Sequence, residues 1–163
     1  MLNGCPVKLK GTNLHHDHAG VGRGIPVRLW EYRIKKMKTI GSNAIRTSHN
    51  PMSPGFLDLC DRLGMLVIEE HRLNGNNREH IGLLEHMIKR DRNHPCIILW
   101  SIGNEEWALE GNERGLRIPK SMSEKVHQLE STRRSTQGPA GALVSRFGVD
   151  VKGYNYLRQN PID

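Results

Sequence analysis

The sequence predicts an α/β fold built on a parallel β-sheet. Short apolar runs typical of buried strands alternate with segments in which apolar residues recur at helical spacing. Polar side chains with site-like chemistry follow the end of one predicted strand after another. Repeated strand–loop–helix order implies right-handed crossovers. Polar residues at several successive strand ends favour a (β/α) barrel over a doubly wound sheet, which gathers them only near its switch point.

The predicted elements follow one another in a regular order. Strands are predicted at residues 7–13, 42–46, 65–69, 97–102 and 150–156. The helices between them are marked by Pro26, Gly41, Ser53-Pro54, Gly64, Ile81, Leu84, Met87 and Ile88, and a polar helix continues to about Gln128. The 163 residues suit one domain but fall short of the roughly 250 of a complete barrel. A partial (β/α)8 barrel with about five to six of the eight strands is therefore expected.

Composition argues against several classes of protein. The formal net charge is +7, but the Lys and Arg residues are scattered and aromatic residues make up only 5%, so nucleic acid is not an expected partner. No apolar stretch has the length of a membrane span, and neither GxGxxG nor GxxxxGK[ST] occurs. Cys5, Cys60 and Cys96 are an odd number without a CxxC, which argues against a disulfide framework and slightly favours a cytoplasmic location.

Candidate functional residues stand at four successive strand ends. They are His15-His16-Asp17, Arg46 with His49, Glu69-Glu70, and Asn104-Glu105. The most informative stretch is CIILWSIGNEEW, residues 96–107, in which an apolar run stops at Gly103-Asn104 and presents two adjacent carboxylates. In a barrel the carboxyl ends of all strands meet at one rim, where active sites are built.

Each candidate also has a purely structural interpretation. From spacing alone, Glu105 and Glu106 could equally stabilise a helix N-terminus, where negative charge is favourable. His15, His16 and His18 would supply three metal ligands, but the Gly-rich loop offers no convincing fourth, and solvated loop histidines are the simpler interpretation. Arg46 could be a structural ion-pair partner of Glu70, and Trp107 could pack at the rim or stack on a sugar.

Five stretches occur together in a characteristic order. They are KLKGTNLHHDHAGVG, NAIRTSHNP, FLDLCDRLGMLVIEE, RDRNHPCIILWSIGNEEW and DVKGYNY, and they span the chain from about Leu2 to Tyr156. In this order they resemble the barrel domain of glycoside hydrolase family 2, and its β-galactosidases most closely. The resemblance implies hydrolysis of terminal β-D-galactosides by a retaining double displacement. The alternatives are a β-glucuronidase or β-mannosidase of the same family, or a non-catalytic remnant that binds sugars or serves as an interaction module.

The resemblance also implies roles for individual residues. Glu105 matches the family's general acid/base, and Asn104 matches the residue that binds the sugar 2-hydroxyl. The remaining substrate-binding residues expected from it are Arg46 and His49 (the family's R-x-S-H pair), His15, Asp17, Glu70 and Trp107. Glu69 is a mild departure, because the family usually has Asp-Glu where this chain has Glu69-Glu70. No metal site is assigned and no cofactor is expected, although the resemblance allows a divalent or monovalent cation.

The chain departs from the family pattern in its expected nucleophile. A retaining glycosidase uses one carboxyl group to protonate the leaving oxygen and a second, about 5 Å away, to attack the anomeric carbon. The resemblance places that nucleophile on a seventh strand, in a motif that does not occur here. The stretch from Ser131 to Val149 looks shorter than in relatives, and the two N-terminal β-sandwich domains of the family are not recognised. The open edges of such a partial sheet predict a homo-oligomer.

Overall fold

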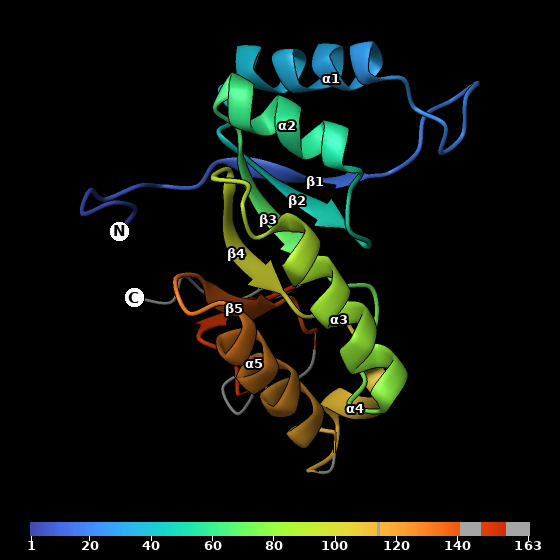
Figure 1. Cartoon of the computed structure of the whole chain (residues 1–163), viewed down its shortest axis with the longest axis vertical. Coiled ribbons are helices and arrows are strands. Elements are labelled where there is room, and N and C mark those ends of the chain that lie inside the picture. The colour runs from blue at the N-terminus through green and yellow to red at the C-terminus, as the bar shows by residue number, and fades with distance from the viewer. Residues whose placement is uncertain (114, 141–147, 156–163) are drawn as a thin grey trace.

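A computed structural model describes residues 1–113, 115–140 and 148–155 of the chain. These residues form a six-stranded sheet in which every neighbouring pair is parallel and the strand order is β1-β2-β3-β4-β5-β6. The strands are β1 (Gly11–His15), β2 (Ala44–Ser48), β3 (Leu66–Glu70), β4 (Ile97–Ser101), β5 (Arg134–Gln137) and β6 (Val151–Lys152). The helices are α1 (Val27–Thr39), α2 (Pro54–Leu63), α3 (Arg78–Asp91), α4 (Trp107–Glu110) and α5 (Arg117–Leu129). Sequential strand order with a helix in most crossovers confirms the predicted partial barrel (Figure 1).

The helices cover one face of the sheet. Side chains alternate between the two faces of a strand, and in β3 Val67 and Glu69 are buried while Leu66 and Ile68 are only half-buried. The buried face packs against Trp30 and Phe56 of α1 and α2, whose rings meet edge to face with centroids 5.0 Å apart. Further along, α3 and α5 lie side by side and add Leu84, Ile88, Met122 and Val126 to the same core (Figure 1). The opposite face is the inner face of the incomplete barrel.

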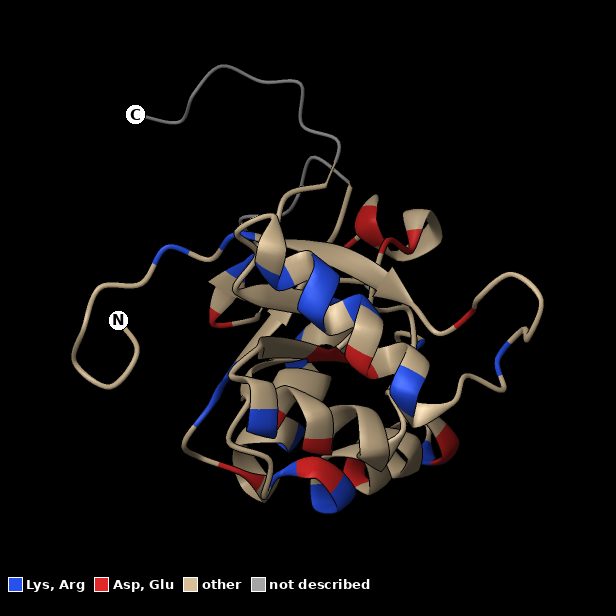
Figure 2. Cartoon of the chain, turned by 90° about the horizontal axis from the view of Figure 1, so that it is seen from above, with Lys and Arg blue, Asp and Glu red and all other residues tan. Residues whose placement is uncertain are grey.

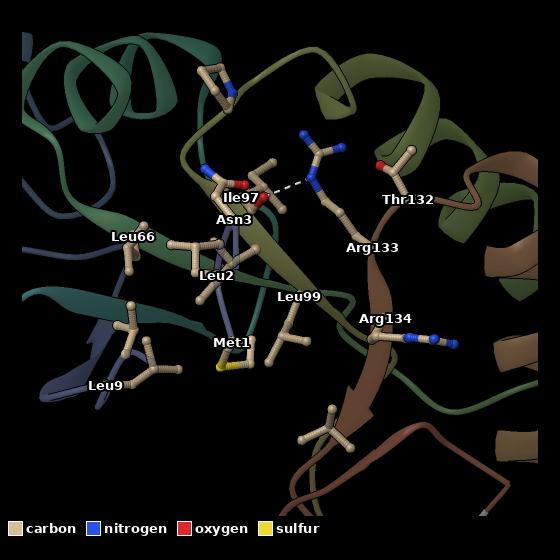
Figure 3. Close-up of a pocket in the computed structure, with 14 residues that line it drawn as sticks. Met1, Leu2, Asn3, Leu9, Leu66, Ile97, Leu99, Thr132, Arg133 and Arg134 are labelled. Carbon is tan, nitrogen blue, oxygen red and sulfur yellow. Dashed lines mark hydrogen bonds between the residues drawn. The ribbon is translucent and has the colours of Figure 1, made fainter. Parts of the chain in front are cut away.

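The inner face borders a cavity of about 890 Å³ near the amino ends of the strands (Figure 3). Its wall is formed by the N-terminal arm and by strand residues that include Leu66 and Leu99, and the Arg133 side chain reaches in to donate to the Ile97 carbonyl at 2.7 Å. Figure 2 shows Lys and Arg interspersed with acidic residues along the helices. None of the helices in the described ranges is long and apolar enough to cross a membrane.

Glycine ends two helices as the sequence predicts. Gly64 is the C-cap of α2 with a left-handed φ of 64°, and its N–H donates to the Cys60 carbonyl. Gly41 follows the C-cap of α1 with a φ of 86°. A side chain at either position would be strained, because residues with a Cβ rarely adopt positive φ. These two residues therefore set where α1 and α2 stop and where β2 and β3 begin.

Several predicted boundaries are wrong. The first strand is Gly11–His15 and not residues 7–13, because the Asn43 side chain takes the place of a strand partner: its Oδ1 accepts from Lys10 N at 2.7 Å and its Nδ2 donates to Lys8 O at 3.0 Å. The second strand continues to Ser48. The last strand is only Val151–Lys152, and residue 156 of the prediction lies outside the described residues.

The region between β4 and β6 differs most from expectation. One polar helix is predicted there, and the structure has the short α4 and the longer α5. The strand β5, with the sequence RSTQ, is missed because it has no apolar alternation. It is a strand because it pairs on both sides, Trp100 with Ser135 and Thr136 with Val151.

Candidate active site

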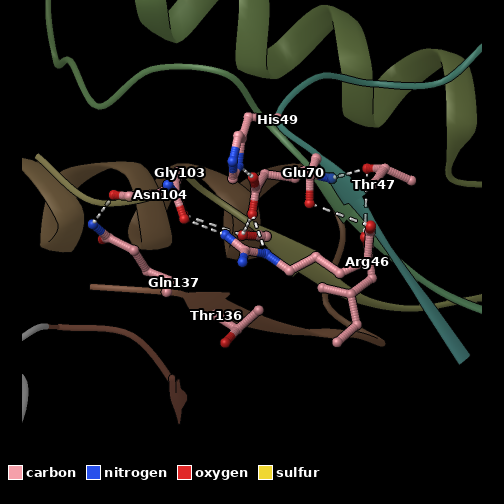
Figure 4. A network of polar contacts seen from close by, with 12 residues as sticks. Arg46, Thr47, His49, Glu70, Gly103, Asn104, Thr136 and Gln137 are labelled. Atoms are coloured by element: carbon pink, nitrogen blue, oxygen red, sulfur yellow. Dashed lines mark hydrogen bonds and ion pairs between the residues drawn. The ribbon is translucent and has the colours of Figure 1, made fainter. Parts of the chain in front are cut away.

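The carboxyl ends of β2, β3 and β4 bring four of the predicted site residues together. Glu70 lies at the centre, and its side chain is completely buried. Its Oε2 accepts from Arg46 Nε at 2.6 Å, and its Oε1 lies 2.7 Å from His49 Nδ1. Arg46 also donates from Nη2 to Asn104 Oδ1 at 2.6 Å, so Arg46 joins β3 to the loop after β4 (Figure 4). We call Arg46, His49, Glu70 and Asn104 the rim cluster.

Two hydroxyl groups complete the environment of Glu70. Ser101 Oγ donates to Glu70 Oε2 at 2.8 Å, and the Glu70 backbone N–H donates to Thr47 Oγ1 at 2.8 Å. A buried carboxylate is costly unless charge and hydrogen bonds compensate for its lost hydration. Here Arg46 supplies the charge, so the predicted ion pair between Arg46 and Glu70 exists. Because Arg46 also binds Asn104, the pair holds a loop of the site as well as the sheet.

Glu105 lies in the loop that follows β4, at the same rim. Its Oε1 accepts from Asn155 Nδ2 at 2.6 Å, and that nitrogen is also 3.3 Å from Asn104 Oδ1 and 2.7 Å from the Gly138 carbonyl. Asn155 therefore links Glu105 to the rim cluster. Glu105 and His49 lie on the same rim, as the sequence predicts. A chain of contacts through Asn155, Asn104, Arg46 and Glu70 connects them.

The backbone of the Glu105 loop is held by side-chain amides. The Asn104 carbonyl accepts from Asn74 Nδ2 at 3.3 Å and from Gln137 Nε2 at 3.2 Å. A Cβ at Gly103 would lie 2.3 Å from Asn74 Oδ1, so only glycine lets Asn74 approach this closely. The GNE motif thus needs its glycine for close packing and its asparagine for Arg46.

Three further predicted site residues lie outside the rim cluster. His15, at the end of β1, is exposed and meets the His49 ring edge-on at a centroid distance of 5.3 Å, which places it next to the cluster. Asp17 is exposed, and its backbone carbonyl accepts from Arg33 Nη1 at 2.7 Å. Trp107 begins α4 and its residue surface is 69% exposed. In the described part of the chain, no hydrogen bond or ring contact joins Asp17 or Trp107 to the cluster, so their roles stay predictions.

The loop histidines are not gathered around a common point. His16 packs edge-on against Trp30 with centroids 5.4 Å apart, and burial, aided by Arg23 and Arg33, lowers its pKa. Within the described residues, the one group of three or more metal-ligand side chains close enough to share an ion is Asp58, Asp61 and His94. Those residues lie before β4, at the end of the sheet opposite Glu105.

Sequence reasoning missed Asn155, Gln137 and Asn74. Asn155 belongs to the motif DVKGYNY, which contributes to the family resemblance by its order along the chain and contains no expected site residue. Gln137 ends β5, the strand that the sequence does not reveal. The only available signal was position, since Gln137 is the last residue of β5 and Asn155 follows β6, near strand ends like the recognised residues.

Comparison with known proteins agrees with this geometry. The sequence profile described as "Glycosyl hydrolases family 2, TIM barrel domain" matches residues 1–84 and 74–143. The chain belongs to this family of glycosyl hydrolases.

Three relatives show how much of a family member the chain represents. It is 34% identical to β-galactosidase BoGH2A of Bacteroides ovatus over 202 residues, covering 95% of this chain and 24% of the relative. It is 36% identical to the β-glucuronidase of Mus musculus over 115 residues, covering 64% of this chain and 18% of the relative. A solved family 2 member from Bacteroides cellulosilyticus superposes with a TM-score of 0.85 and 40% identity, covering 94% of this chain and 22% of that one. The chain thus spans about a quarter or less of each of these proteins.

Proposed function

We propose that the chain forms the acid/base side of a retaining glycosidase site for β-galactosides. The observation that carries the proposal is the position of Glu105 after β4, joined through Asn155 and Asn104 to the charged pair of Arg46 and Glu70. Relatives that cover nearly the whole chain are named β-galactosidases, which supports the choice of substrate.

The contacts suit the first chemical step. Glu105 would donate its proton to the glycosidic oxygen as the bond to the anomeric carbon breaks. Arg46 binds the amide oxygen of Asn104, and this orients Asn104 Nδ2 as a donor toward a substrate hydroxyl. A hydrogen bond to the 2-hydroxyl strengthens as the sugar gains oxocarbenium character, so Asn104 would bind the transition state more tightly than the substrate.

Double displacement also requires a nucleophile. The family resemblance places this carboxylate on a seventh strand, and the described residues form six strands. Proton transfer alone contributes about 10²–10⁴-fold, a small part of the acceleration that glycosidases need. We therefore expect the 163-residue chain by itself to hydrolyse β-galactosides very slowly or not at all while still binding the sugar.

A uronic acid is the main alternative substrate, since several relatives are named β-glucuronidases. A glucuronide carboxylate would need a cation to pair with it. Arg46, the arginine of the rim cluster, is already paired with the buried Glu70 and bound to Asn104. A neutral sugar such as galactose fits this charge balance better.

The test uses purified chain, free of host galactosidase, with nitrophenyl β-galactoside, β-glucuronide and β-mannoside. We expect slow turnover at most, restricted to the galactoside. Any turnover should fall by about 10²-fold or more in Glu105→Gln. Binding of a non-hydrolysable β-thiogalactoside, measured by calorimetry, should weaken in Asn104→Ala.

Preference for the glucuronide, or turnover that Glu105→Gln leaves unchanged, would refute the proposal.

A further inference from the structure

Glu110 is a buried carboxylate outside the rim cluster, and it takes no part in the proposed proton transfer. It is the last residue of α4, and its residue surface is only 2% exposed. Its Oε1 accepts from the backbone N–H of Glu106 at 3.0 Å, and its Oε2 accepts from the backbone N–H of Ala140 at 2.9 Å. Each oxygen therefore binds a different segment of the chain.

One of these bonds has an ordinary explanation. Glu106 is the N-cap of α4, and a carboxylate that reaches back to the N-cap N–H is a familiar way to begin a helix. The bond to Ala140 has no such explanation, because Ala140 follows β5 and is 30 residues away in sequence. A helix cap also needs no burial, whereas burial of a carboxylate is costly unless its oxygens are satisfied.

The segment that Glu110 reaches also binds the other parts of the site. The Asn155 side chain donates to the Gly138 carbonyl at 2.7 Å, and the Asn155 backbone N–H donates to the Pro139 carbonyl at 3.0 Å. A Cβ at Gly138 would lie 3.0 Å from Arg46 Nη2 and from Asn155 Nδ2. Residues 138–140 thus contact Asn155, which in turn binds the Glu105 carboxylate.

We propose that Glu110 is a positioning residue that fixes Glu105 against Asn155. One oxygen of Glu110 binds the backbone N–H of Glu106, the residue after Glu105. The other binds the backbone N–H of Ala140, next to Pro139, whose carbonyl accepts from the Asn155 backbone N–H. The Glu110 side chain thereby holds the Glu105 carboxyl group and the Asn155 side-chain amide at hydrogen-bonding distance from each other. The role rests on the proposed function only insofar as Glu105 is the acid/base; the geometry that Glu110 imposes is independent of the substrate.

A carboxylate is the group that this position requires. Both neighbours are N–H donors, so Glu110 must offer two acceptors. Glutamine has one acceptor oxygen and would turn its NH₂ group toward the other N–H. Glu110→Gln therefore breaks one of the two bonds with almost no change in volume, and Glu110→Asp keeps both acceptors on a shorter side chain.

The experiment compares the whole chain with Glu110→Gln, Glu110→Asp and Glu124→Gln. Glu124 is an exposed residue of α5, so Glu124→Gln removes the same charge without touching the site. Nuclear magnetic resonance would follow exchange of the Glu106 and Ala140 backbone amides and of the Asn155 side-chain amide. We expect at least one backbone amide and the Asn155 amide to exchange about tenfold faster or more in Glu110→Gln. Glu110→Asp should recover part of the protection, and Glu124→Gln should match the unmodified chain.

A second measurement separates positioning from mere stability. Affinity for a β-thiogalactoside should fall about tenfold in Glu110→Gln and recover in part in Glu110→Asp. Faster backbone exchange with an unchanged Asn155 amide would overturn the positioning role, and so would unchanged exchange at all three sites. If Glu110→Gln does not fold, the amide exchange rates and the thiogalactoside affinity of Glu110→Asp decide whether Glu110 is a positioning residue. A chain that binds no thiogalactoside would contradict the proposed function, and the Asn155 exchange would still decide the role of Glu110.

Discussion

Glu69 and Glu70 are adjacent in β3 and point to opposite faces of the sheet. Glu70 lies on the inner face with Arg46 and His49, whereas Glu69 lies under the helices, where its Oε1 accepts from the Met52 backbone N–H at 2.8 Å. Burial is the main cause that raises the pKa of Glu69 to about 8, and the hydrogen bond from Met52 opposes it. One carboxyl group therefore serves the candidate site while its neighbour is kept protonated near neutral pH.

The protonation of Glu69 predicts how stability depends on pH. The unfolded chain releases this proton near pH 4.5, and the folded chain keeps it up to about pH 8. The folded state thus binds more protons in this window, so the free energy of unfolding should fall as pH rises from about 5 to 8. Glu69→Gln keeps an acceptor for Met52 and cannot ionise, so it should be more stable than the unmodified chain at pH 8, by up to about 5 kcal/mol.

Chemical denaturation at pH 5 and pH 8 would check this prediction. All other titrating groups are common to the unmodified chain and Glu69→Gln. The difference between the two proteins in how the free energy of unfolding changes with pH therefore reports on Glu69. Glu124→Gln, at an exposed position, is the control and should follow the unmodified chain. Equal pH slopes for Glu69→Gln and the unmodified chain would contradict the prediction.

At the scale of elements, β5 depends on one acidic side chain. Asp150 Oδ2 accepts from Ser135 N at 2.7 Å and from Ser135 Oγ at 2.9 Å, and lies 2.8 Å from His127 Nε2. Asp150 precedes β6, so these contacts join α5, β5 and β6 in place of the apolar side chains that β5 lacks. Burial by itself would raise the pKa of Asp150, but the bonds from Ser135 and His127 outweigh it and lower the pKa below 3.8.

Asp150→Asn should therefore weaken the β5 end of the sheet. We expect a loss of about 1–2 kcal/mol in the free energy of unfolding at pH 7, because bonds to a charged acceptor are replaced by weaker ones. Since the folded pKa is lowered, the contribution is present above pH 3.8 and is lost as pH falls through the folded value, so the difference between the proteins should shrink in acid. Thermal unfolding would measure it, with Glu124→Gln, at an exposed position of α5, as the control. A difference that grows in acid would count against this account.

At the scale of the whole molecule, the sheet has two edges and an incompletely covered inner face. Within the described residues, β1 and β6 each pair on one side, and the cavity of about 890 Å³ is bordered by exposed aliphatic residues that include Val7, Leu9 and Val151. Unpaired parallel edges beside apolar surface favour pairing with another chain. Self-association therefore stays a prediction that the structure makes more specific, because it locates the surface.

A single charge on that surface should reduce self-association. Leu9 is 41% exposed beside β1, so Leu9→Lys should cost the monomer little and should disfavour contact along this edge. Leu83→Lys, at a residue that is 55% exposed on α3, is the matched control on the opposite face. Sedimentation velocity at tens of micromolar should show species larger than 18.5 kDa for the unmodified chain and Leu83→Lys, and a smaller fraction for Leu9→Lys. A clean monomer for the unmodified chain would end this idea.

The sequence by itself determined the parts of the molecule that have strong local signals. Apolar runs, strand–loop–helix order and helix-ending glycines such as Gly64 identify five of the six strands and the helices α1, α2 and α3, because burial and positive φ restrict which residues can stand there. Parallel topology then places residues that follow each strand on one rim, which is why Arg46, His49, Glu70 and Asn104 could be predicted to meet. Resemblance added the expected role of Glu105.

Only the tertiary structure decided the features that depend on distant partners. β5 is polar and becomes a strand through its neighbours, and Asn43 shortens β1 by binding the backbone of Lys8 and Lys10 more than 30 residues away. Asn155 and Glu110 likewise have chemistry typical of any surface loop until the fold places them against Glu105 and Ala140. Local sequence records what a residue can donate, accept or bury. Which group it meets is set by the fold of the whole chain, because each of these bonds closes a long loop.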